Sequence, residues 1–297
     1  MKELPNPMFP ISQLGVRATF WRAPEPARKA MQAPIEVPVQ VQMPAAPSAQ
    51  QPAVATQGIT VSWARHQDDV RAAQRLRHEV FAGEMGARLN TPLAGHDIDL
   101  FDDFCEHLLV REEASGMVIG TYRVLTPAQA RRVGSTYSDT EFDLPRLRDL
   151  RERMVELGRS CVHRDHRQGG VILALWGALA GFMHRNRLDT MIGCASIPMS
   201  HHGVSGGDAA ASIWRQLSAT HMAPIEYQVQ PRLPLPVDRL DGALDVEPPA
   251  LIKGYLRLGA KVLGAPAWDP DFNTADLPML MRISDLPPRY RKHFLGN

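Results

Sequence analysis

The stretch VELGRSCVHRDHRQGG, residues 155–170, has the pattern of a buried strand that runs into a glycine pair. Glu156 and Arg159 interrupt its apolar part, although charged side chains are rarely buried unless they are paired. The apolar run that follows predicts a buried helix over about 169–185. A strand, a glycine turn and a helix therefore follow one another, and the two charges inside the strand need a functional explanation.

Helical and strand patterns alternate on both sides of this stretch. The sequence predicts a strand over 59–64, a helix over 68–84 with Asp68 as N-cap, a hairpin from HLLVRE and MVIGTYRVL, and a strand over 154–163. Further on it predicts a strand over 189–196, a helix in DAAASIWRQLSATH, a strand in IEYQVQ, a helix in PALIKGYLRLGAK that ends at Gly259, and strands near 261–264 and 278–283. This order favours an α/β fold with a mixed sheet covered by helices on both faces.

Composition excludes several classes of protein. The 297 residues carry a formal net charge of +1, which argues against non-specific nucleic-acid binding because that binding needs a dense basic patch. Cys105, Cys161 and Cys194 form no CxxC pair, so we expect no disulfide framework and a cytoplasmic protein. The uncharged, strongly apolar stretch 168–183 is shorter than the roughly 20 residues of a membrane-spanning helix. The N-terminus lacks the pattern of a secretory signal.

Residues 1–57 contain ten prolines and no sustained periodicity. This composition predicts a disordered arm, followed by one domain over 58–297. Within the arm, FPISQLGVRATFWRAP mixes apolar residues with Arg17 and Arg22. Two interpretations stay open: peripheral contact with an anionic membrane surface, and an unstructured tail.

The segment Arg167-Gln168-Gly169-Gly170 opens the predicted helix. N–H groups at a helix N-terminus are unpaired and carry partial positive charge, and glycine lets a phosphate approach them. The segment resembles the turn with which GCN5-related N-acetyltransferases hold the pyrophosphate or phosphopantetheine of their acyl donor. Ile172 stands where that turn usually ends in a small residue, which favours a donor with a single phosphodiester, such as acyl carrier protein. Arg164, Arg167, Gly169 and Gly170 are then the expected donor site.

Four further motifs occur in a set order: LRHEVF with Arg77 and Phe81, HDIDLFDD with Asp97, Asp99 and Asp102, GTYRVLTP with Arg123, and VELGRS with Glu156 and Arg159. This order resembles the shared core of the acyl-homoserine-lactone synthases and the ornithine N-alpha-acyltransferases. The lactone synthases normally carry a tryptophan after the Arg-x-x-x-Phe helix, where this chain has residues 84–88, EMGAR. The resemblance to the ornithine enzymes continues through GCASIPMSHHG, DFNTAD and PPRYRKHF and covers essentially 58–297.

The resemblance implies a GNAT-like, mostly antiparallel sheet and an enzyme without a cofactor. It implies transfer of a 3-hydroxylated fatty acyl group from acyl carrier protein to the α-amine of L-ornithine, which gives lyso-ornithine lipid. Two alternatives stay open. One is acyl-homoserine-lactone synthesis or synthesis of another N-acyl amino acid, and the other is a non-catalytic module that binds acyl carrier protein or lipid.

Amide formation from a thioester needs an unprotonated amine and an acceptor for its proton. Glu156 is the candidate base, because partial burial raises the pKa of a carboxyl group toward neutrality. The alternative is a buried structural ion pair with a neighbouring arginine. Arg159, three residues on, points to the opposite face of a regular strand and reaches the same pocket only if the strand bulges, as it typically does in the superfamily.

The remaining candidates contact the substrates. Arg77 and Arg123 offer bidentate bonds to the acceptor's carboxylate or the donor's phosphate, and Phe81 and Arg159 complete the substrate site. Asp97, Asp99 and Asp102 are candidates for the cationic amines of ornithine, and solvated turn chemistry is their alternative role.

Other motifs are weaker. The segment CVHRDH, residues 161–166, and His201-His202 lack the ligand spacing of a zinc site, so no metal is expected. His184 and Asp189 match a glycerolipid acyltransferase signature by letter only.

Overall fold

The computed structural model describes residues 58–295, so the predicted arm and its membrane contact lie outside the described residues. The strands are β1 Ile59–Trp63, β2 Glu106–Glu112, β3 Val118–Leu125, β4 Phe142–Asp143, β5 Met154–Val162, β6 Thr190–Pro198, β7 Gln230–Pro231, β8 Lys261–Val262, β9 Ala267–Asp269 and β10 Thr274–Arg282. The α-helices are α1 Gln67–His78, α2 Pro127–Val133, α3 Ser138–Glu141, α4 Gly170–Arg185, α5 Asp208–Thr220, α6 Ala250–Arg257 and α7 Pro288–Leu295. A π-helix, η1, spans Glu79–Glu84, and the 3₁₀ turns are η2 Pro145–Leu150, η3 Arg164–His166, η4 Ile225–Tyr227, η5 Val237–Arg239 and η6 Ile283–Asp285.

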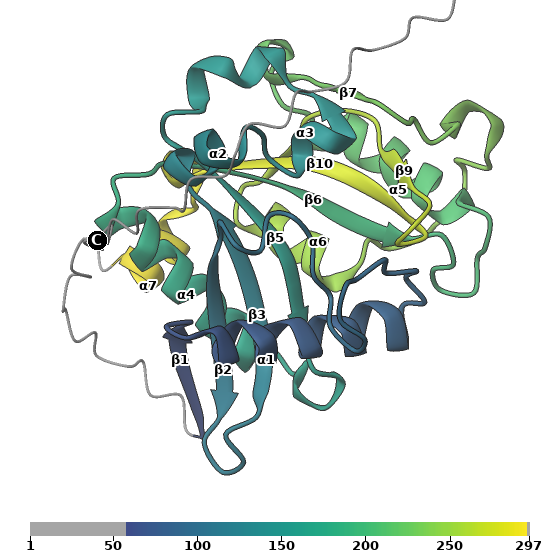
Figure 1. Ribbon diagram of the computed structural model, residues 1–297. Coiled ribbons are helices and arrows are strands. Elements are labelled where there is room, and N and C mark those ends of the chain that lie inside the picture. The colour runs from purple at the N-terminus through teal and green to yellow at the C-terminus, as the bar shows by residue number, and fades with distance from the viewer. Residues whose placement is uncertain (1–57, 296–297) are drawn as a thin grey trace, which may run out of the picture. The chain divides into compact units, whose positions relative to one another are not determined.

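The described residues contain an eight-stranded sheet in the order β1-β2-β3-β5-β6-β10-β8, with β9 also paired to β10. Strands β5 and β6 run parallel, and the other pairs that the structure describes in this sheet are antiparallel (Figure 1). A separate small sheet pairs β4 with β7. The prediction of a mixed, mostly antiparallel sheet is confirmed.

Strand β5 carries an extra residue opposite β3. Thr121 pairs with Cys161, whereas Arg123 pairs with Gly158. Arg159, inside this bulge, has a φ of 50°, a left-handed conformation that costs free energy when the residue has a side chain. One extra residue reverses the alternation of side chains along a strand, which brings Glu156 and Arg159 to the same cavity.

The parallel pairing of β5 with β6 is short. It runs from Met154–Thr190 to Glu156–Ile192, and beyond that point the two strands separate (Figure 1). Gly193 lies at the separation, where a Cβ would come within 2.3 Å of the Leu157 carbonyl oxygen. The two strands therefore approach closely at one end and open a space in the sheet at the other.

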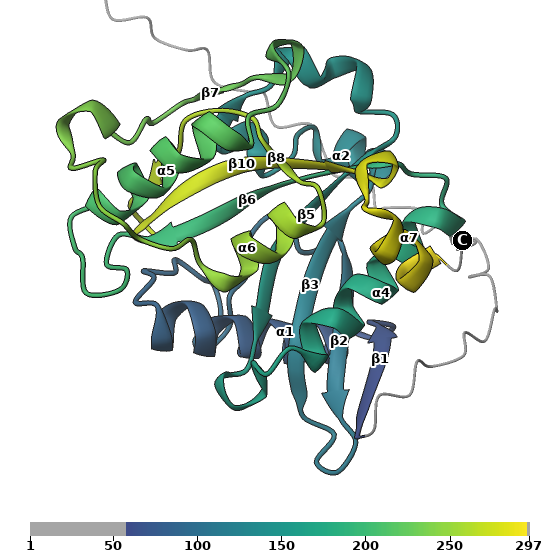
Figure 2. The same ribbon diagram turned by 180° about the vertical axis from the view of Figure 1, so that it is seen from behind.

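Helices α1 and α4 cover opposite faces of the N-terminal half of the sheet. Helix α4 packs in one apolar cluster with Leu108 and Val110 of β2, and α1 packs in another with Leu109 between them. Successive residues of a strand point to opposite faces, so the helices lie on different sides of β2 (Figures 1 and 2). Gly120 of β3 allows close approach of α4, because a Cβ there would lie 2.5 Å from the Val171 side chain.

The C-terminal half has a separate core between the sheet and helices α5 and α6. Ile197 of β6, Leu277 of β10, Ile213 of α5 and Ile252 of α6 are all buried in it. The space between β5 and β6 lies between the two cores. None of the helices in residues 58–295 is long and apolar enough to cross a membrane.

Most of the predicted elements are present, but three predictions were wrong. The helix predicted over 68–84 is α-helical only to His78 and continues as the π-helix η1. Its N-cap is His66 and not Asp68, because the Asp69 carboxylate accepts hydrogen bonds from the N–H groups of Arg65 and His66. IEYQVQ forms η4 and a loop instead of a strand. The last strand begins at Thr274, four residues before the predicted start.

Candidate active site

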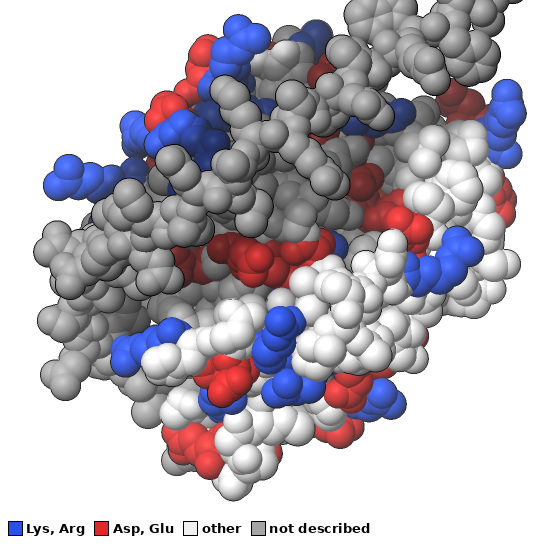
Figure 3. Space-filling model, in the orientation of Figure 1, with Lys and Arg blue, Asp and Glu red and all other residues white. Residues whose placement is uncertain are grey.

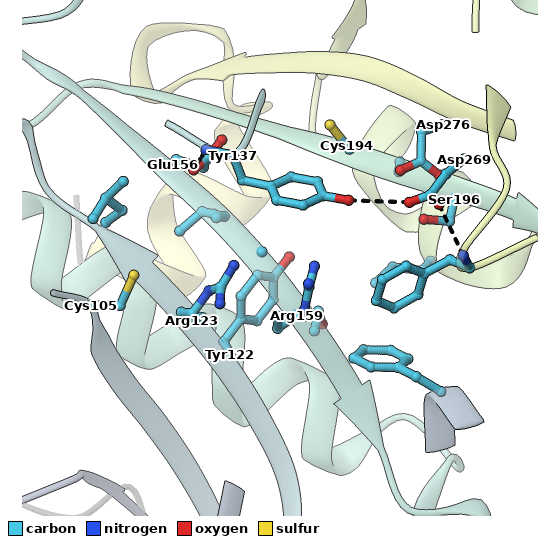
Figure 4. Close-up of a pocket in the computed structure, with 18 of the residues that line it drawn as sticks. Cys105, Tyr122, Arg123, Tyr137, Glu156, Arg159, Cys194, Ser196, Asp269 and Asp276 are labelled. Carbon is cyan, nitrogen blue, oxygen red and sulfur yellow. Dashed lines mark hydrogen bonds between the residues drawn. The ribbon is translucent and has the colours of Figure 1, made fainter. Parts of the chain in front are cut away.

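A cavity of about 200 Å³, here called the central cavity, lies where β5 and β6 separate (Figure 4). Its lining residues are Phe81, Met85, Cys105, Tyr122, Arg123, Leu125, Tyr137, Glu156, Leu157, Gly158, Arg159, Ser160, Cys194, Ala195, Ser196, Leu251, Tyr255, Asp269, Phe272 and Asp276. The bulged strand β5 thus contributes Glu156 and Arg159 to one site, together with residues from segments far away in the sequence.

Glu156 is buried at the inner end of the central cavity. Its two carboxylate oxygens accept hydrogen bonds from the backbone N–H groups of Tyr137, at 2.7 Å, and Ser138, at 2.6 Å. Burial raises the pKa of Glu156, while the hydrogen bonds from Ser138 and Tyr137 and the charge of Arg123 act in the opposite direction. Glu156 forms no ion pair within the described residues, so the predicted structural pairing with an arginine is not what the structure contains.

Arg77 is fully buried and forms the centre of an ion-pair network beside the cavity. Its guanidinium donates to Asp97 at 2.8 Å and to Asp102 at 2.7 and 2.9 Å. Burial alone would raise the pKa of Asp102, but the charges of Arg77 and Arg123 outweigh it and hold this pKa well below the usual range. These contacts stabilise ionised carboxylates in the interior.

The roles predicted for Arg77, Asp97 and Asp102 do not fit this geometry. None of the three lines the central cavity, and each already has a partner of opposite charge. The solvated-turn alternative does not fit Asp97 and Asp102 either, because both are buried. Their spacing in HDIDLFDD is explained by the arginines they bind.

Arg123 and Arg159 do line the central cavity. Arg123 donates to Asp99 at 2.6 Å and to Asp102 at 3.2 Å, and Arg159 donates to Asp97 at 3.1 Å and to Asp99 at 3.0 Å. The Arg159 guanidinium also lies over the rings of Tyr137 and Phe272, 4.9 and 4.7 Å from their centroids. Both arginines are thus held rigidly at the cavity wall.

A second cavity of about 490 Å³ adjoins the start of α4. This turn-side cavity is lined by Val80, Phe81, Glu84, Met85, Ser160, Cys161, Val162, His166, Arg167, Gly169, Ile172, Trp176, Pro249, Ala250 and Leu251. Gly169 has a φ of 100°, and a Cβ on Gly169 or Gly170 would meet no atom within 4 Å. The helix N-terminus therefore faces open space, as binding of a phosphate there requires.

The arginines predicted for the donor site lie at this turn. Arg167 pairs with Glu84 at 2.8 Å and donates to the Val162 carbonyl oxygen at 2.9 Å. Arg164 is more exposed and lies 3.8 Å from Glu84. The contact between Arg167 and Glu84 could not be predicted from the local sequence.

A third cavity of about 430 Å³, the outer cavity, adjoins the central cavity on another side. Tyr137, Arg159, Asp269 and Phe272 line both. The outer cavity is also lined by Asp99, Glu141 and Asp271. Figure 3 shows Asp and Glu side chains gathered near the middle of the face that it displays. Such a surface attracts cations.

Several lining residues were missed by the sequence analysis. Tyr137, Asp269 and Asp276 belong to the central cavity, and Glu141 to the outer one. Asp276 had a detectable signal, since it is a carboxylate at a buried position of an apolar strand, and it is part of the quoted DFNTAD. Tyr137 and Asp269 had no signal in the local sequence, because they become neighbours only through the fold. The Tyr137 hydroxyl donates to Asp269 Oδ2 at 3.2 Å.

The three cysteines do not provide a nucleophile. Burial raises the pKa of Cys105 and Cys161 to about 12 and that of Cys194 well above its usual value. A neutral thiol reacts slowly with a thioester, so attack by a cysteine is disfavoured. Within residues 58–295, no group of three or more His, Cys, Asp or Glu side chains is placed to hold a metal ion.

Comparison with known proteins agrees with this geometry. Residues 76–177 match the Acetyltransferase (GNAT) domain. An L-ornithine N(alpha)-acyltransferase of Rhodobacter capsulatus is 35% identical over 250 residues, which cover 78% of this chain and 92% of that protein. The Brucella abortus protein of the same name is 35% identical, over 76% of this chain and 84% of its own length. Among solved structures, a CoA-dependent acyl-homoserine lactone synthase, BjaI, is 16% identical over 80% of this chain and 89% of its own, with a TM-score of 0.48.

The mixed sheet, the glycine turn at the start of α4 and the cavity between β5 and β6 define an acyltransferase with the GNAT fold. At this level of identity and coverage, the chain belongs to the L-ornithine N(alpha)-acyltransferase family.

Proposed function

We propose that this enzyme transfers a long, 3-hydroxylated acyl group from the phosphopantetheine of acyl carrier protein to the α-amine of L-ornithine, and that it needs no further cofactor. The product is a lyso-ornithine lipid. The names of the relatives supply the acceptor, and the turn at Gly169-Gly170 supports a phosphate-bearing donor. We place the enzyme in the cytoplasm. Because its product is a lipid, we expect it at the membrane surface during product release.

The observation that carries the proposal is the continuity of the three cavities. The central cavity shares Phe81, Met85, Ser160 and Leu251 with the turn-side cavity. It shares Tyr137, Arg159, Asp269 and Phe272 with the outer cavity. A donor held at the α4 turn and an acceptor held in the acidic outer cavity therefore meet beside Glu156.

In the reaction, the amine nitrogen attacks the thioester carbonyl carbon, the C–N bond forms and the C–S bond breaks. The starting ammonium loses two protons in total. One passes to the departing thiolate, and the other must leave through a base. Glu156 is the proposed base, directly or through water, since its carboxylate lines the cavity and burial raises its pKa. Tyr137 and Ser138 hold this carboxylate in place through their N–H groups.

The donor assignment rests on the single phosphodiester of phosphopantetheine and on the acidic surface of carrier proteins. Arg164 and Arg167 lie on the exposed side of the turn and offer cations to such a surface. Coenzyme A would bring additional phosphates but no protein surface. The two donors therefore make different demands on these arginines.

The purified protein should be incubated with a 3-hydroxyacyl carrier protein, a panel of amino acids and S-adenosylmethionine, and the products identified by mass. We expect N-acylornithine as the main product, with a lower rate when acyl-coenzyme A replaces the carrier protein. Formation of a homoserine lactone would assign the chain to lactone synthesis. Binding of the carrier protein without any amide product would indicate a non-catalytic module.

A further inference from the structure

The walls of the central and outer cavities are divided by charge. Figure 4 shows Arg123 and Arg159 on one side of the central cavity and Asp269 and Asp276 on the other. Glu141 lies on the acidic side of the outer cavity, which shares Asp269 with the central one. Opposite charges therefore face each other across a space that is continuous from the outer to the central cavity.

The two sides differ in how their charges are compensated. Each arginine pairs with two aspartates of the 97–102 segment. On the acidic side, no Lys, Arg or His of residues 58–295 forms an ion pair with Asp269, Asp276 or Glu141. The acidic groups are nevertheless deeply placed, since Asp276 is 3% exposed and Asp269 is 6% exposed. A buried carboxylate without a cation is costly, and natural proteins rarely keep one without a use.

The hydrogen-bond donors that Asp269 and Asp276 have within residues 58–295 are neutral groups. Thr274 Oγ1 donates to Asp276 Oδ1 at 2.8 Å, and Figure 4 shows Ser196 beside the same side chain. Asp269 Oδ1 accepts from the N–H groups of Asp271 and Phe272, both at 2.9 Å, and Asp269 Oδ2 accepts from the Tyr137 hydroxyl at 3.2 Å. Asp269 is thus oriented by its own loop and by Tyr137, whereas Asp276 accepts from Thr274 and has the Ser196 hydroxyl as a second neutral neighbour.

The raised pKa values of Asp276 and Glu141 agree with carboxyl groups that have no cation as a partner. Burial raises the pKa of Asp276 to about 6. Burial, and then the neighbouring carboxylates of Asp276 and Asp269, raise the pKa of Glu141 to about 7. A cation placed between them would lower both values again and favour the ionised forms.

We propose that Asp276, with Asp269 and Glu141, forms the subsite for the side-chain ammonium of the acceptor. This inference rests on the proposed function, because ornithine is an α-amino acid with a second ammonium at the end of its side chain. Arg159 suits the other end of the acceptor. Its Nε and one Nη are bound to Asp97 and Asp99, and its other Nη has no hydrogen-bond partner in residues 58–295 and is available to the α-carboxylate.

The test compares ornithine with norvaline, which has the same carbon chain but lacks the side-chain amine. Values of kcat/KM are measured for both acceptors, at a saturating concentration of acylated carrier protein, in the wild-type enzyme and in Asp276→Asn. We expect the wild type to prefer ornithine by about 10²-fold or more, the scale of a lost buried charge contact. In Asp276→Asn this preference should fall at least tenfold, mainly through a higher KM for ornithine, while norvaline is affected much less.

Two further variants make the result interpretable. Glu141→Gln removes a less buried carboxylate of the same subsite and should reduce the preference in the same direction. Asp238→Asn removes an exposed carboxylate on η5 that lines none of the three cavities, and it should leave the preference unchanged. Ornithine-dependent stabilisation against thermal unfolding gives a second readout, which should be weaker in Asp276→Asn even if turnover is too slow to measure.

The outcomes separate this inference from the proposed function. If the wild type acylates ornithine but Asp276→Asn lowers kcat for both acceptors equally, then Asp276 acts on the reacting amine or on the fold, and the subsite assignment is wrong. If the wild type does not acylate ornithine with any donor, the proposed function itself fails. Equal use of norvaline and ornithine by the wild type would also exclude a side-chain ammonium subsite.

Discussion

Three arginines and three aspartates neutralise one another beside the active site, and this compensation sets them apart from the carboxylates that line the cavity. Asp102 accepts from Arg77 and Arg123, and Asp97 and Asp99 hold Arg159. Glu156 and Asp276 have no such partner within the described residues. At the residue scale, the network therefore supports the fold, and the uncompensated carboxylates remain available for substrate.

Substitution of Arg77 tests the structural role of the network. Arg77→Met leaves Asp97 and Asp102 buried with less charge compensation, so we expect the free energy of unfolding to fall by about 3–5 kcal/mol. Urea denaturation measures this change. Arg75→Met, on the exposed side of the same helix, is the matched control and should shift stability by no more than about 0.5 kcal/mol. A stable Arg77→Met enzyme with a specific loss of substrate binding would restore the role first predicted for Arg77.

Glu156→Gln tests the proposed base. The rate of acyl transfer should fall by about 10²-fold or more, the usual scale of general base catalysis, while donor binding is retained. The pH profile separates this role from a structural one: the acidic limb of kcat/KM that reports ionisation of Glu156 should disappear in the variant. A normal profile with a reduced rate would instead indicate that Glu156 only positions Tyr137 and Ser138.

Asp276 links function to stability. Its pKa rises from 3.8 to about 6 on folding, so between these values the native state binds more protons than the unfolded state. The free energy of unfolding therefore falls as the pH rises through this window. We expect Asp276→Asn to raise Tm at pH 8 and to change it much less at pH 4, in thermal unfolding without substrate. An equal shift at both pH values would show that the carboxylate is not strained in the native state.

At the scale of single elements, two features of β5 create the site. The bulge turns Arg159 to the side of Glu156, and the early end of its pairing with β6 opens the sheet. The strand then leads through η3 into α4, so the donor turn is directly connected to the catalytic strand.

The donor turn can be tested by charge reversal. Arg164→Glu with Arg167→Glu should mainly raise the apparent KM for acylated carrier protein, and wild-type activity with this donor should fall as salt concentration rises, because exposed charge pairs are screened. Arg148→Glu on η2 is the control, since η2 precedes β5 and the turn follows it. Equal efficiency with acyl-coenzyme A, unchanged by the reversals, would contradict the donor assignment.

Gly170→Val should impair the enzyme more than the charge reversals do. The space around Gly170 is open within 4 Å of the position of a Cβ, so the valine side chain is expected to fit without disturbing the fold. It would then occupy the approach of the phosphate to the first N–H groups of α4. Donor binding should be lost while Tm is nearly unchanged, and a normal KM for the donor would place the phosphate elsewhere.

At the scale of the whole molecule, the described residues 58–295 contain the eight-stranded sheet and the apolar clusters on its faces. We therefore expect deletion of residues 1–57 to leave folding and activity in solution largely intact. Thermal unfolding and turnover of the truncated protein check this, with the full chain as the reference. A large drop in Tm would mean that the arm packs into the domain.

Much of this arrangement could be predicted from the sequence. The apolar periodicity of the hairpin, β5, α4 and α5 indicated their type, because these segments bury one face or are wholly apolar. The motif VELGRS placed Glu156 and Arg159 on one strand, and RQGG placed the donor turn at the start of a helix. The family resemblance supplied the reaction, which no local pattern contains.

Tertiary structure alone decided which charged groups are free to act. Arg77, Arg123 and Asp102 looked like substrate ligands in the sequence but bind one another across 21 to 25 residues of chain. Asp269 reaches Tyr137 across 132 residues, and its neighbour Asp276 remains without a cation. The interaction energy of a charged group in a protein depends on its burial and on its partners. Both arise from contacts between segments distant in the sequence. Local patterns therefore predict where a carboxylate sits on a strand or turn, but only the folded sheet determines which arginine neutralises it.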